Sequence, residues 1–550
     1  MNTRPFLRVP PFPGRRIETL AEPGEATFGK GEDARVLAML LRSARVGGDF
    51  WGAQPTLPKR RDVLLAPDSQ AQAAEMLADI AEKGLHRRAV MIGPYAAGDN
   101  IPVISKLCDP WHLVDQAAQV HVGANSELAL VAAICEKPVE VFGTGRFAML
   151  AHTGLDDCLE SELLRDWRWC DPFTGVRVEP SQAITLLASW RRLIDANREA
   201  AGVYGVAMWK RVTADAMLWD GSGPVRHMTA GGRATRALEP GAKVLAWKSR
   251  TSPRLPDDLA ARGIAVGELE DGMIRSAGLG ANCVPPLSII ADFAGAHFDP
   301  AQTSGLEQIL QHGEISADAV TRAAALRMRL VQAGISKYGR DGSTVIARLP
   351  GAQQRVLVTG QVEDDRSMLT GGAGCTNLDL LRRAREREPG AWLIYKPHPD
   401  VEAGHRKGAI ADADVLQYAS EIERQAPITA LIDSVDAVHV ITSLAGFEAL
   451  MREKAVTVYG VPFYAGWGLT TDLGPVPSRR SRRRSLDELV AAALLLYPRY
   501  LDPVTRLPCP VEIMVERMAK GTASVTSPLV WLREAQGQLK LAYQRLTKRG

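Results

Sequence analysis

The sequence predicts an α/β protein whose second half forms two Rossmann-type lobes, preceded by a degenerate partial copy of the second lobe's block. Two observations predict this fold class. Short β-branched runs alternate with helical patterns over residues 241–350 and again over 351–475, which is typical of parallel sheets covered by helices on both faces. An internal repeat then places a similar strand–helix block within residues 61–150.

Five short apolar runs in the second half are predicted to be buried strands. Helical patterns follow several of them, for example at 378–388 and 444–453. Ligands of open parallel sheets bind beyond the carboxyl ends of the strands, so the polar residues that follow these runs are candidates for a cleft between the lobes. The runs are Lys243–Trp247, Arg355–Thr359, Trp392–Tyr395, Ala437–Ile441 and Ala455–Tyr459.

The repeat joins VHVGANSELALVAAICEKPVEVFG, which begins at Val120, and VHVITSLAGFEALMREKAVTVYG, which begins at Val438. It continues at LDD and LDE, beginning at Leu155 and Leu486, and at DPFT and DPVT, both pairs displaced by 331 residues. Strand–helix–strand units can share apolar texture by chance, but agreement over several strings favours duplication. Only about 60 residues precede the first copy, too few for a partner lobe with its own sheet.

These patterns divide the chain into six parts, with a Gly-rich linker between the halves. The parts are an N-terminal segment (1–60), a half-module expected to be inactive (61–225), the linker (226–240), an N-terminal lobe (241–350), a C-terminal lobe with crossing helices (351–525) and a helical tail (526–550).

The composition is ordinary for a globular protein, with 46% apolar and 23% charged residues. A net charge of +3 without a basic aromatic stripe argues against nucleic-acid binding. The seven cysteines, none in a CxxC pattern, favour reduced cytoplasmic thiols over disulfides or structural zinc. The N-terminus lacks the apolar core of a signal peptide, and no apolar run approaches the ~18–20 residues that span a bilayer. We therefore expect any membrane contact to be peripheral.

The string EDGMIRS follows the apolar run 264–266 and brings two adjacent carboxylates to a strand end. Glu270 or Asp271 could act as a general acid/base. Arg275, with Ser276 beside it, could hold a substrate carboxylate through a two-pronged contact. A helix-capping turn with a surface arginine is the alternative.

Two further strings follow predicted strands. In GQVEDD, Asp365 could be a nucleophile, or Glu363 and Asp365 could bind a metal, or the loop could be merely solvated. In KPHP, two prolines hold Lys396 and His398 in extended backbone. A cationic pair suits a phosphate leaving group, although a lone histidine is more often structural.

The string TSLAGFE joins a predicted strand to a helix, with Ser443 as a natural N-cap. Free amides and the helix dipole make this end a candidate anion site, unless capping is its whole role. The loop VPFYAGWG then carries Tyr464 and Trp467, which suit the face of a base or a sugar. The first copy lacks both KPHP and this loop, so we expect it to be inactive. The run Arg479–Arg484 could attract anionic lipid headgroups, at about 1 kcal/mol per charge, or remain solvated.

Together the strings EDGMIRS, GQVEDD, YKPHPD, TSLAGFEAL and VPFYAGWGLTTD resemble the capsule polysaccharide biosynthesis/export proteins of the KpsC (LipA) type over about residues 241–475. The resemblance implies a GT-B-like fold, with 241–350 as the acceptor-side lobe and 351–525 as the donor-side lobe. It also implies a retaining β-Kdo transferase, which moves the acidic sugar Kdo from CMP-Kdo to a Kdo linker on a phosphatidylglycerol-type lipid, with no cofactor or metal.

By motif position, the resemblance implies that Asp365 is the nucleophile and that Glu270, with Asp271 as the other candidate, is the acid/base. The implied donor-binding residues are Gln361, Lys396, His398, Thr442, Ser443, Gly446 and Glu448. The implied contacts to the substrate carboxylate or acceptor are Arg275, Ser276, Tyr464 and Trp467.

Members of this family commonly carry two complete transferase modules, whereas the first module here lacks the motifs, so we predict a single active site. We expect the protein at the cytoplasmic face of the inner membrane, in peripheral contact with the membrane and with capsule assembly proteins. The alternatives are a GT-B transferase with another nucleotide-sugar donor and a non-catalytic capsule assembly or export factor.

Overall fold

The computed structural model describes residues 4–24, 33–98, 100–152, 154–278, 283–337, 339–340, 346, 353–404 and 406–523. The predicted helical tail at 526–550 lies outside these ranges. Within them, no helix is both long and apolar enough to cross a membrane. The chain forms two compact units. Unit 1 comprises Met1–Glu199, Leu218–Val225 and Thr505–Leu507, and unit 2 comprises Ala200–Met217, Arg226–Val504 and Pro508–Gly550.

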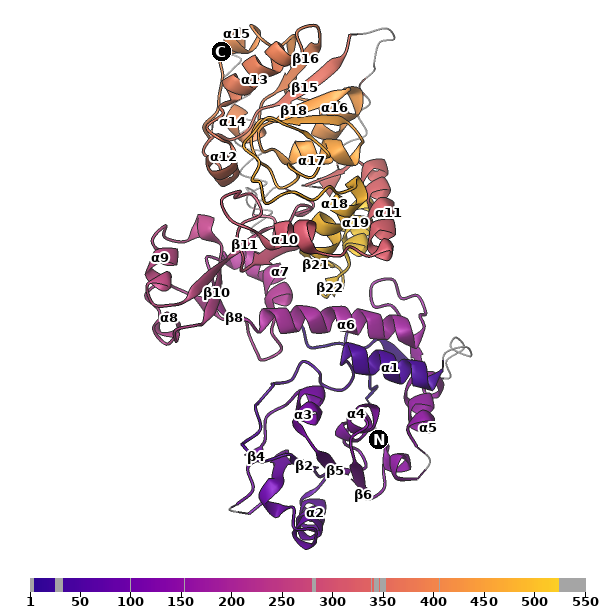
Figure 1. The fold of residues 1–550 in the computed structure, drawn as a ribbon. Coiled ribbons are helices and arrows are strands. Elements are labelled where there is room, and N and C mark those ends of the chain that lie inside the picture. The colour runs from indigo at the N-terminus through magenta and orange to yellow at the C-terminus, as the bar shows by residue number, and fades with distance from the viewer. Residues whose placement is uncertain are drawn as a thin grey trace, which may run out of the picture. The chain divides into compact units, whose positions relative to one another are not determined.

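Unit 1 is built on a five-stranded parallel sheet with the strand order β4-β3-β2-β5-β6 (Figure 1). The N-terminal segment belongs to its core, because Phe12 packs edge-on against Trp190 and Trp219 at centroid distances of 5.7 and 5.1 Å. Its main elements are β1 (Ala21–Pro23), α1 (Ala34–Ala44), β2 (Val63–Ala66), α2 (Gln70–Glu82), β3 (Ala89–Ile92), β4 (Val103–Ile104), α3 (Pro110–Gln116), β5 (Gln119–Gly123), α4 (Leu128–Ile134), β6 (Val139–Phe142), α5 (Leu155–Leu159), η3 (Glu160–Arg165), β7 (Trp167–Trp169) and α6 (Pro180–Asn197).

The first lobe of unit 2 carries a seven-stranded sheet in the order β22-β21-β12-β11-β10-β8-β9. Strands β9, β8, β10 and β11 are parallel, and β12, β21 and β22 continue the sheet in antiparallel fashion. Its elements are β8 (Ala200–Tyr204), α7 (Met208–Leu218), β9 (His227–Met228), α8 (Arg233–Arg236), β10 (Lys243–Ala246), α9 (Leu255–Ala260), β11 (Ala265–Asp271), β12 (Ser288–Asp292), α10 (Gly305–His312), α11 (Ala317–Ala333), β13 (Ile335–Ser336), β14 (Gly339–Arg340), β21 (Arg499–Leu501) and β22 (Pro508–Cys509).

The second lobe carries a six-stranded parallel sheet in the order β17-β16-β15-β18-β19-β20. Its elements are β15 (Arg355–Thr359), α12 (Arg366–Gly371), α13 (Asn377–Arg387), β16 (Trp392–Lys396), α14 (Pro399–Glu402), α15 (Asp412–Val415), β17 (Glu421–Ile422), α16 (Ile428–Ser434), β18 (Ala437–Val440), α17 (Leu444–Met451), β19 (Ala455–Val458) and β20 (Thr471–Asp472). The helices α18 (Leu486–Val490), η6 (Ala491–Leu496) and α19 (Val511–Ala519) follow and pack against α11 of the first lobe.

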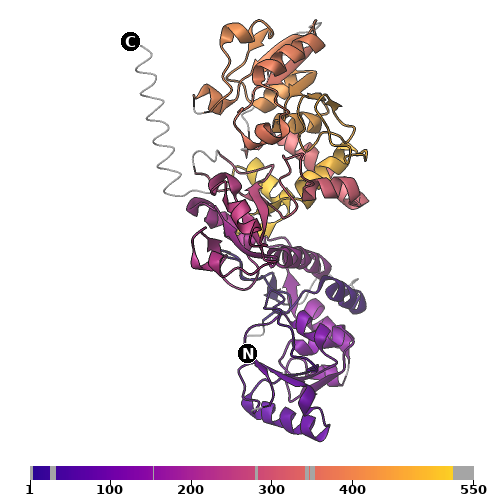
Figure 2. The ribbon, with the colours of Figure 1, turned by 60° about the vertical axis from the view of Figure 1, so that its left-hand side comes forward.

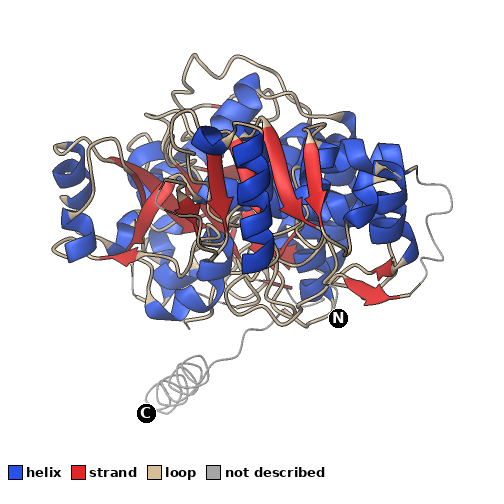
Figure 3. Cartoon of the chain, turned by 90° about the horizontal axis from the view of Figure 1, so that it is seen from below, coloured by secondary structure: helices blue, strands red, loops and turns tan. Residues whose placement is uncertain are grey.

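Helices cover both faces of the second lobe's sheet, with α13 and α16 on opposite sides (Figures 1 and 2). Alternate residues of β15 face these two helices, as the twofold period of a strand requires. Val356 and Val358 belong to the core formed with α13, whereas Leu357 belongs to the core formed with α16. Figure 3 shows the chain coloured by secondary structure, with helices in blue and strands in red. The predicted pair of Rossmann-type lobes is confirmed, and the five predicted strands agree within one residue.

The internal duplication is confirmed by topology. Strands β2 to β6 connect in the same order as β15 to β19, and His121 and His439 take equivalent places on β5 and β18. Downstream, α5 runs into the π-helix η3, and α18 runs into the π-helix η6. These π-helices begin 331 residues apart, the displacement that separates LDD from LDE. Because π-helices are rare, their recurrence at one place indicates common descent of the two copies.

The boundary of the first lobe differs from the sequence-based division. Strand β8 falls in the predicted half-module and β9 in the predicted linker, yet both belong to the first lobe's sheet beside β10. Val203 and Tyr204 of β8 are 3% and 1% exposed, since an interior parallel strand is covered on both faces. The first lobe therefore begins near residue 200 and not at 241.

Candidate functional site

The candidate site lies at the carboxyl end of β11, where the first lobe meets α12 of the second lobe. Glu268 and Glu270 alternate along β11 and so face the same side. Nη1 of Arg366 donates to Oε1 of Glu268 at 2.6 Å and to Oε1 of Glu270 at 2.9 Å, and Nη2 donates to Oε2 of Glu268 at 3.0 Å. Arg366 directly follows Asp365 in the sequence, so these ion pairs hold β11 of the first lobe against the N-terminal turn of α12 in the second lobe.

Glu270 has the properties of a group that exchanges protons near neutral pH. Burial raises the pKa of Glu270 to about 7, the negative charge of Glu268 adds to the rise, and Arg366 opposes it. The side chain is 18% exposed, so a bound molecule can reach it. A carboxyl group whose pKa lies near the working pH is suited to general acid–base catalysis.

Asp271 is held differently. Its Oδ1 accepts from Nζ of Lys210 at 3.1 Å, and its Oδ2 accepts from Nε of Arg275 at 2.9 Å. Burial favours the neutral carboxyl, but Lys210 and Arg275 outweigh it and lower the pKa of Asp271. A carboxylate kept ionised by two cations is a poor proton acceptor, so this geometry favours Glu270 over Asp271 as the acid/base.

The predicted role of Arg275 and Ser276 in holding a substrate carboxylate is not supported by their surroundings. Arg275 is 2% exposed, and Nη1 and Nη2 donate to Oγ of Ser276 at 2.6 Å and to the carbonyl of Val284 at 2.9 Å. Ser276 is fully buried and donates to the carbonyl of Gly278. A buried guanidinium must have its N–H groups satisfied, and here the loop after β11 satisfies them. The pair therefore braces this loop.

The three carboxylates of GQVEDD have different hydrogen-bond partners, and Arg406 also lies near two of them, with Nη2 3.9 Å from Oδ1 of Asp365. Glu363 accepts the backbone N–H of Asn377 at 2.8 Å, and Asp364 pairs with Arg406 at 3.0 Å. Asp365 is the N-cap of α12 and accepts from the backbone N–H and the hydroxyl of Ser367 at 3.3 and 2.8 Å. Its side chain is 52% exposed. Asp365 is thus the accessible carboxylate next to Arg366.

His398 caps α14, and its Nδ1 accepts the backbone N–H of Asp400 at 3.2 Å. This bond leaves the ring proton of the neutral form on Nε2. Burial lowers the pKa of His398, while Asp400 and Asp365 act in the opposite direction, which places His398 within the electrostatic range of Asp365. Lys396 is half-buried at the end of β16.

The remaining predicted donor-binding residues gather where β15 and β18 end. Ser443 caps α17 and accepts the backbone N–H of Ala445 at 3.2 Å. Gln361 accepts the backbone N–H of Thr442 at 2.8 Å and donates to its hydroxyl at 3.0 Å, which ties the two strand ends together.

Gly446 and Glu448 follow Ser443 on the same helix. A Cβ on Gly446 would lie 2.2 Å from the hydroxyl oxygen of Tyr464, so this position requires glycine. Glu448 is buried and accepts the backbone N–H of Lys337 at 3.2 Å. Glu448 thus ties α17 to the turn that links β13 and β14.

The predicted role of Tyr464 and Trp467 as a cover for a base or sugar is wrong for this structure. Both side chains are fully buried. The hydroxyl of Tyr464 donates to the carbonyl of Ser443 at 2.5 Å, and Nε1 of Trp467 donates to the carbonyl of Phe463 at 2.8 Å. The loop folds around its own aromatic rings, whose burial removes a large apolar area from water and whose polar atoms both find backbone partners.

The basic run is largely structural. Arg479 and Arg480 both pair with Glu307, at 2.5 and 2.8 Å. Arg484 is buried and donates to carbonyl oxygens at the end of α10. Arg482 and Arg483 are the exposed arginines of the run.

Sequence reasoning missed several groups at this site, because nothing in the local pattern marks them. Glu268 and Arg366 meet across 98 residues of sequence, and Lys210 comes from a helix assigned to the half-module. His297 was also missed. It is enclosed by the rings of Phe298, Phe463 and Tyr497, burial lowers its pKa to about 3, and Nδ1 has no hydrogen-bond partner among the described residues.

Among its described residues, unit 1 differs from unit 2 at the helix end that corresponds to Ser443. The N-cap of α4 is Glu127, whose side chain makes no capping bond. Its carboxylate accepts from Nη1 and Nη2 of Arg8 at 2.5 and 2.8 Å. A carboxylate paired with Arg8 therefore lies at the helix end where unit 2 has the hydroxyl of Ser443.

One cluster among the described residues has the composition of a metal site, formed by Asp79, His121 and Glu140 of unit 1. The ammonium of Lys83 lies 2.8 Å from an oxygen of Asp79 and 2.6 Å from an oxygen of Glu140. Lys83 thus supplies the positive charge that these carboxylates require.

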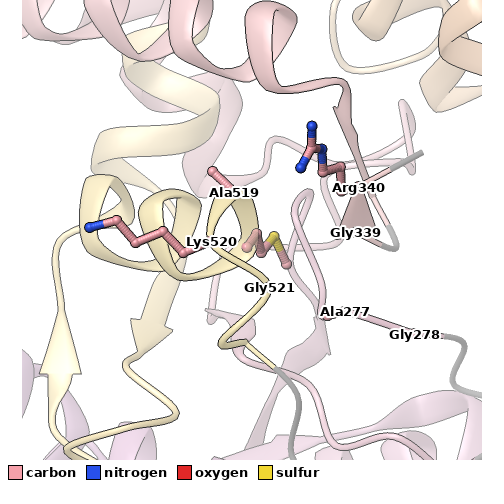
Figure 4. Close-up of a pocket in the computed structure, with 8 residues that line it drawn as sticks. Ala277, Gly278, Gly339, Arg340, Ala519, Lys520 and Gly521 are labelled. Atoms are coloured by element: carbon pink, nitrogen blue, oxygen red, sulfur yellow. The ribbon is translucent and has the colours of Figure 1, made fainter. Parts of the chain in front are cut away.

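A pocket of about 420 Å³ lies beside the loop that follows Ser276 (Figure 4). None of the predicted site residues lines it. Lys520 extends away from the other labelled residues in the figure and pairs with Glu516 at 3.1 Å. The pocket is therefore separate from the cluster around Glu270 and Asp365.

Comparisons with known proteins identify the family to which this chain is similar. The model of the family described as capsule polysaccharide biosynthesis protein matches residues 338–500. The capsule polysaccharide modification protein LipA of Neisseria meningitidis serogroup A is 36% identical over 427 residues, which are 74% of this chain and 60% of LipA. The lipopolysaccharide-processing protein LpsZ of Rhizobium meliloti is 47% identical over 241 residues, or 43% of this chain and 54% of LpsZ.

A solved structure agrees with these relatives. The beta Kdo 2,4 transferase of Thermosulfurimonas dismutans KpsC matches with 29% identity and a TM-score of 0.50, over 58% of this chain and 98% of that one. The present chain spans 60% of the length of LipA, so it corresponds to part of that protein. Its GT-B-like pair of lobes matches one transferase structure almost in full. The chain therefore belongs to the capsule polysaccharide biosynthesis proteins of the KpsC and LipA type.

Proposed function

We propose that unit 2 is a glycosyltransferase that moves Kdo from CMP-Kdo to a lipid-linked Kdo acceptor during capsular polysaccharide synthesis. One observation carries the proposal: Arg366, which directly follows the exposed Asp365 on the second lobe, pairs with Glu270 of the first lobe at 2.9 Å. We assign Asp365 as the nucleophile, Glu270 as the proton acceptor and the strand ends near His398 and Ser443 as the anion-binding side of a cleft between the two lobes.

In the first step, a carboxylate oxygen of Asp365 attacks the anomeric carbon of Kdo, and the bond from that carbon to the phosphate oxygen breaks. CMP leaves with the bonding electrons. Lys396, the Nε2–H of His398 and the amides at the Ser443 end of α17 stabilise the charge that develops on the phosphate. The hydrogen bonds between Gln361 and Thr442 fix the strand ends that carry these groups. The sugar is then bound covalently to Asp365 with inverted configuration.

In the second step, a hydroxyl group of the acceptor attacks the same carbon from the opposite side. Its proton passes to Glu270, and the Asp365 carboxylate leaves. Two inversions retain the configuration, as in retaining glycosidases. Glu270 must be ionised to accept this proton, so transfer is expected to rise with pH through the region of its pKa, which is about 7.

The acceptor belongs to a membrane, and we propose peripheral contact with the inner membrane and with capsule assembly proteins. Arg482 and Arg483 are the exposed cations of the basic run. Replacing both with alanine should weaken binding to vesicles of anionic phospholipid in a sedimentation assay. Equal binding by the double variant excludes this run as the contact.

Transfer by the purified chain tests the proposal. Incubation with CMP-Kdo and a short Kdo-lipid acceptor should give a product extended by Kdo, and other nucleotide sugars should neither react nor compete. Asp365→Ala should abolish the product, whereas Asp68→Ala, at the corresponding strand end of unit 1, should leave it. Transfer from a different nucleotide sugar overturns the choice of donor. Transfer by the Asp365 variant overturns the nucleophile.

A further inference from the structure

We propose that Arg366 is a positioning residue that fastens the two lobes together through Glu268 and thereby sets when Glu270 can accept a proton. The proposal rests on the function proposed above for Glu270. Its geometry, however, stands independently, because three hydrogen bonds of 2.6 to 3.0 Å join α12 of one lobe to β11 of the other.

Glu268 is the anchor of this contact. It is 1% exposed and accepts from Nη1 and Nη2 of Arg366, and Nζ of Lys248 lies 3.1 Å from its Oε2. A buried carboxylate needs such partners, because removing them leaves an uncompensated charge out of water. Arg366 is in turn packed over the ring of Phe298, with Cζ 4.8 Å from the ring centroid. The guanidinium is therefore fixed in one orientation.

The negative charge of Glu270 is balanced by fewer nearby cations than that of Glu268. Among the described residues, the charged groups that act on it are Glu268 and Asp271 of its own strand, Arg366 of α12 and Lys210 of α7. Lys210 is committed to Asp271, and Lys248 to Glu268. Arg366 is thus the cation that both contacts Glu270 and comes from the opposite lobe.

A consequence follows for the catalytic cycle. When the lobes are together, Arg366 favours the ionised form of Glu270, which can accept a proton from the acceptor hydroxyl. When they separate, Glu270 and Glu268 remain side by side without the guanidinium, and their mutual repulsion favours protonation of one of them. Closure of the cleft and readiness of the base are therefore coupled through one side chain.

The test uses two variants that break the same ion pair from opposite sides. Arg366→Ala removes a positive charge beside Glu270, so the rising limb of the pH–rate profile should move to higher pH by about one unit, with kcat at pH 7 reduced about fivefold. Glu268→Gln removes a negative charge, so the same limb should move to lower pH. Arg366→Lys keeps the charge and should hold the limb near its original place.

Hydrogen–deuterium exchange measures closure without any donor or acceptor. In Arg366→Ala, the backbone amides of 265–273 and 366–371 should exchange faster, and those of β5 in unit 1 should be unchanged. Arg382→Ala is the matched control, since Arg382 lies on the same lobe in an exposed pair with Asp379 at 3.3 Å. It should alter neither exchange nor the pH profile.

The outcomes separate this proposal from the proposed function. If the chain transfers Kdo but both variants move the pH limb in one direction, or leave it in place, the role of Arg366 is overturned and the function stands. If amide exchange in 265–273 is unaltered in Arg366→Ala, Arg366 does not fasten the lobes, and this conclusion holds whether or not the chain transfers Kdo. If exchange changes as expected but no Kdo is transferred, the fastening holds and the proposed function fails.

Discussion

Gln361 and Thr442 exchange two hydrogen bonds, one through each polar atom of the glutamine amide. The contact joins the loops that leave the adjacent strands β15 and β18. Unit 1 has a counterpart at the ends of β2 and β5, where Asp68 accepts the backbone N–H of Asn125 at 2.8 Å. The two copies therefore keep a similar tie between strand ends, although the polar side chains around it differ.

Replacing Gln361 with alanine should lower stability by about 2 kcal/mol, because it removes both bonds and leaves a buried amide N–H unpaired. Transfer activity per folded molecule should fall at least tenfold as the strand ends lose their register. Denaturant unfolding and initial rates measure the two effects. Asp68→Ala is the control: activity should be unaffected, and an equal loss in both variants contradicts a site confined to unit 2.

Glu270→Gln should make the protein more stable at pH 8 but not at pH 4.5. In the unfolded chain this carboxyl loses its proton near pH 4.5, whereas in the folded chain its pKa is about 7. Between these values the unfolded state binds fewer protons, so wild-type stability falls as pH rises, and the loss is complete above pH 7. The shift corresponds to roughly 3 kcal/mol.

Thermal or urea unfolding at the two pH values checks this prediction. Glu386→Gln alters an exposed carboxyl, 67% exposed on α13, and should show no such pH-dependent gain. If the difference in unfolding free energy between Glu270→Gln and wild type is the same at both pH values, the pKa of Glu270 is not raised.

Gly446→Ala should reduce CMP affinity at least tenfold and lower the melting temperature. The added methyl group would lie 2.2 Å from the hydroxyl oxygen of Tyr464 and 2.8 Å from its Cζ, and the fully buried ring cannot retreat. The N-terminal turn of α17 must therefore shift. Calorimetric titration with CMP measures the loss. Gly390→Ala, with no atom within 4 Å of its added carbon, should bind as wild type; unchanged binding in Gly446→Ala contradicts the assignment.

Arg480→Ala should destabilise the protein by about 3–5 kcal/mol, the usual cost of breaking a buried ion pair. The side chains of Arg480 and Glu307 are 3% and 4% exposed, and Arg480 also donates to the carbonyls of Pro462 and Ala465. Denaturant unfolding measures the loss. The neighbouring Arg483 is exposed, so its alanine variant should stay within about 0.5 kcal/mol of wild type; similar values for both would mean that the run is solvated throughout.

The sequence predicted the sheets and the duplication because both depend on local periodicity. Strands such as β15 and β18 are short apolar runs, and the copies share strings at fixed displacements. That Glu270 and Asp365 share a site stays a prediction from their positions after strand ends. The contact of Arg366 with Glu268 and Glu270 could not be predicted, since it depends on how the two lobes pack and not on any local pattern.

The wrong predictions share a physical cause. Arg275, Tyr464 and Trp467 belong to functional-looking strings, but the sequence does not say which way a side chain faces in a loop. All three are buried and satisfied by nearby backbone or side-chain groups. The predicted start of the first lobe was also wrong, because β8 and β10, which pair in its sheet, are separated by 38 residues of sequence.

In the proposed reaction, Asp365 of unit 2 is the single residue that carries the sugar during transfer. Mass spectrometry of the Glu270→Gln variant, incubated with CMP-Kdo without acceptor, is the most direct measurement, because this variant should form the covalent intermediate but discharge it slowly. We expect one Kdo residue per chain, on the peptide that contains Asp365. An adduct on any other residue, or active transfer by an enzyme that never carries one, would contradict it.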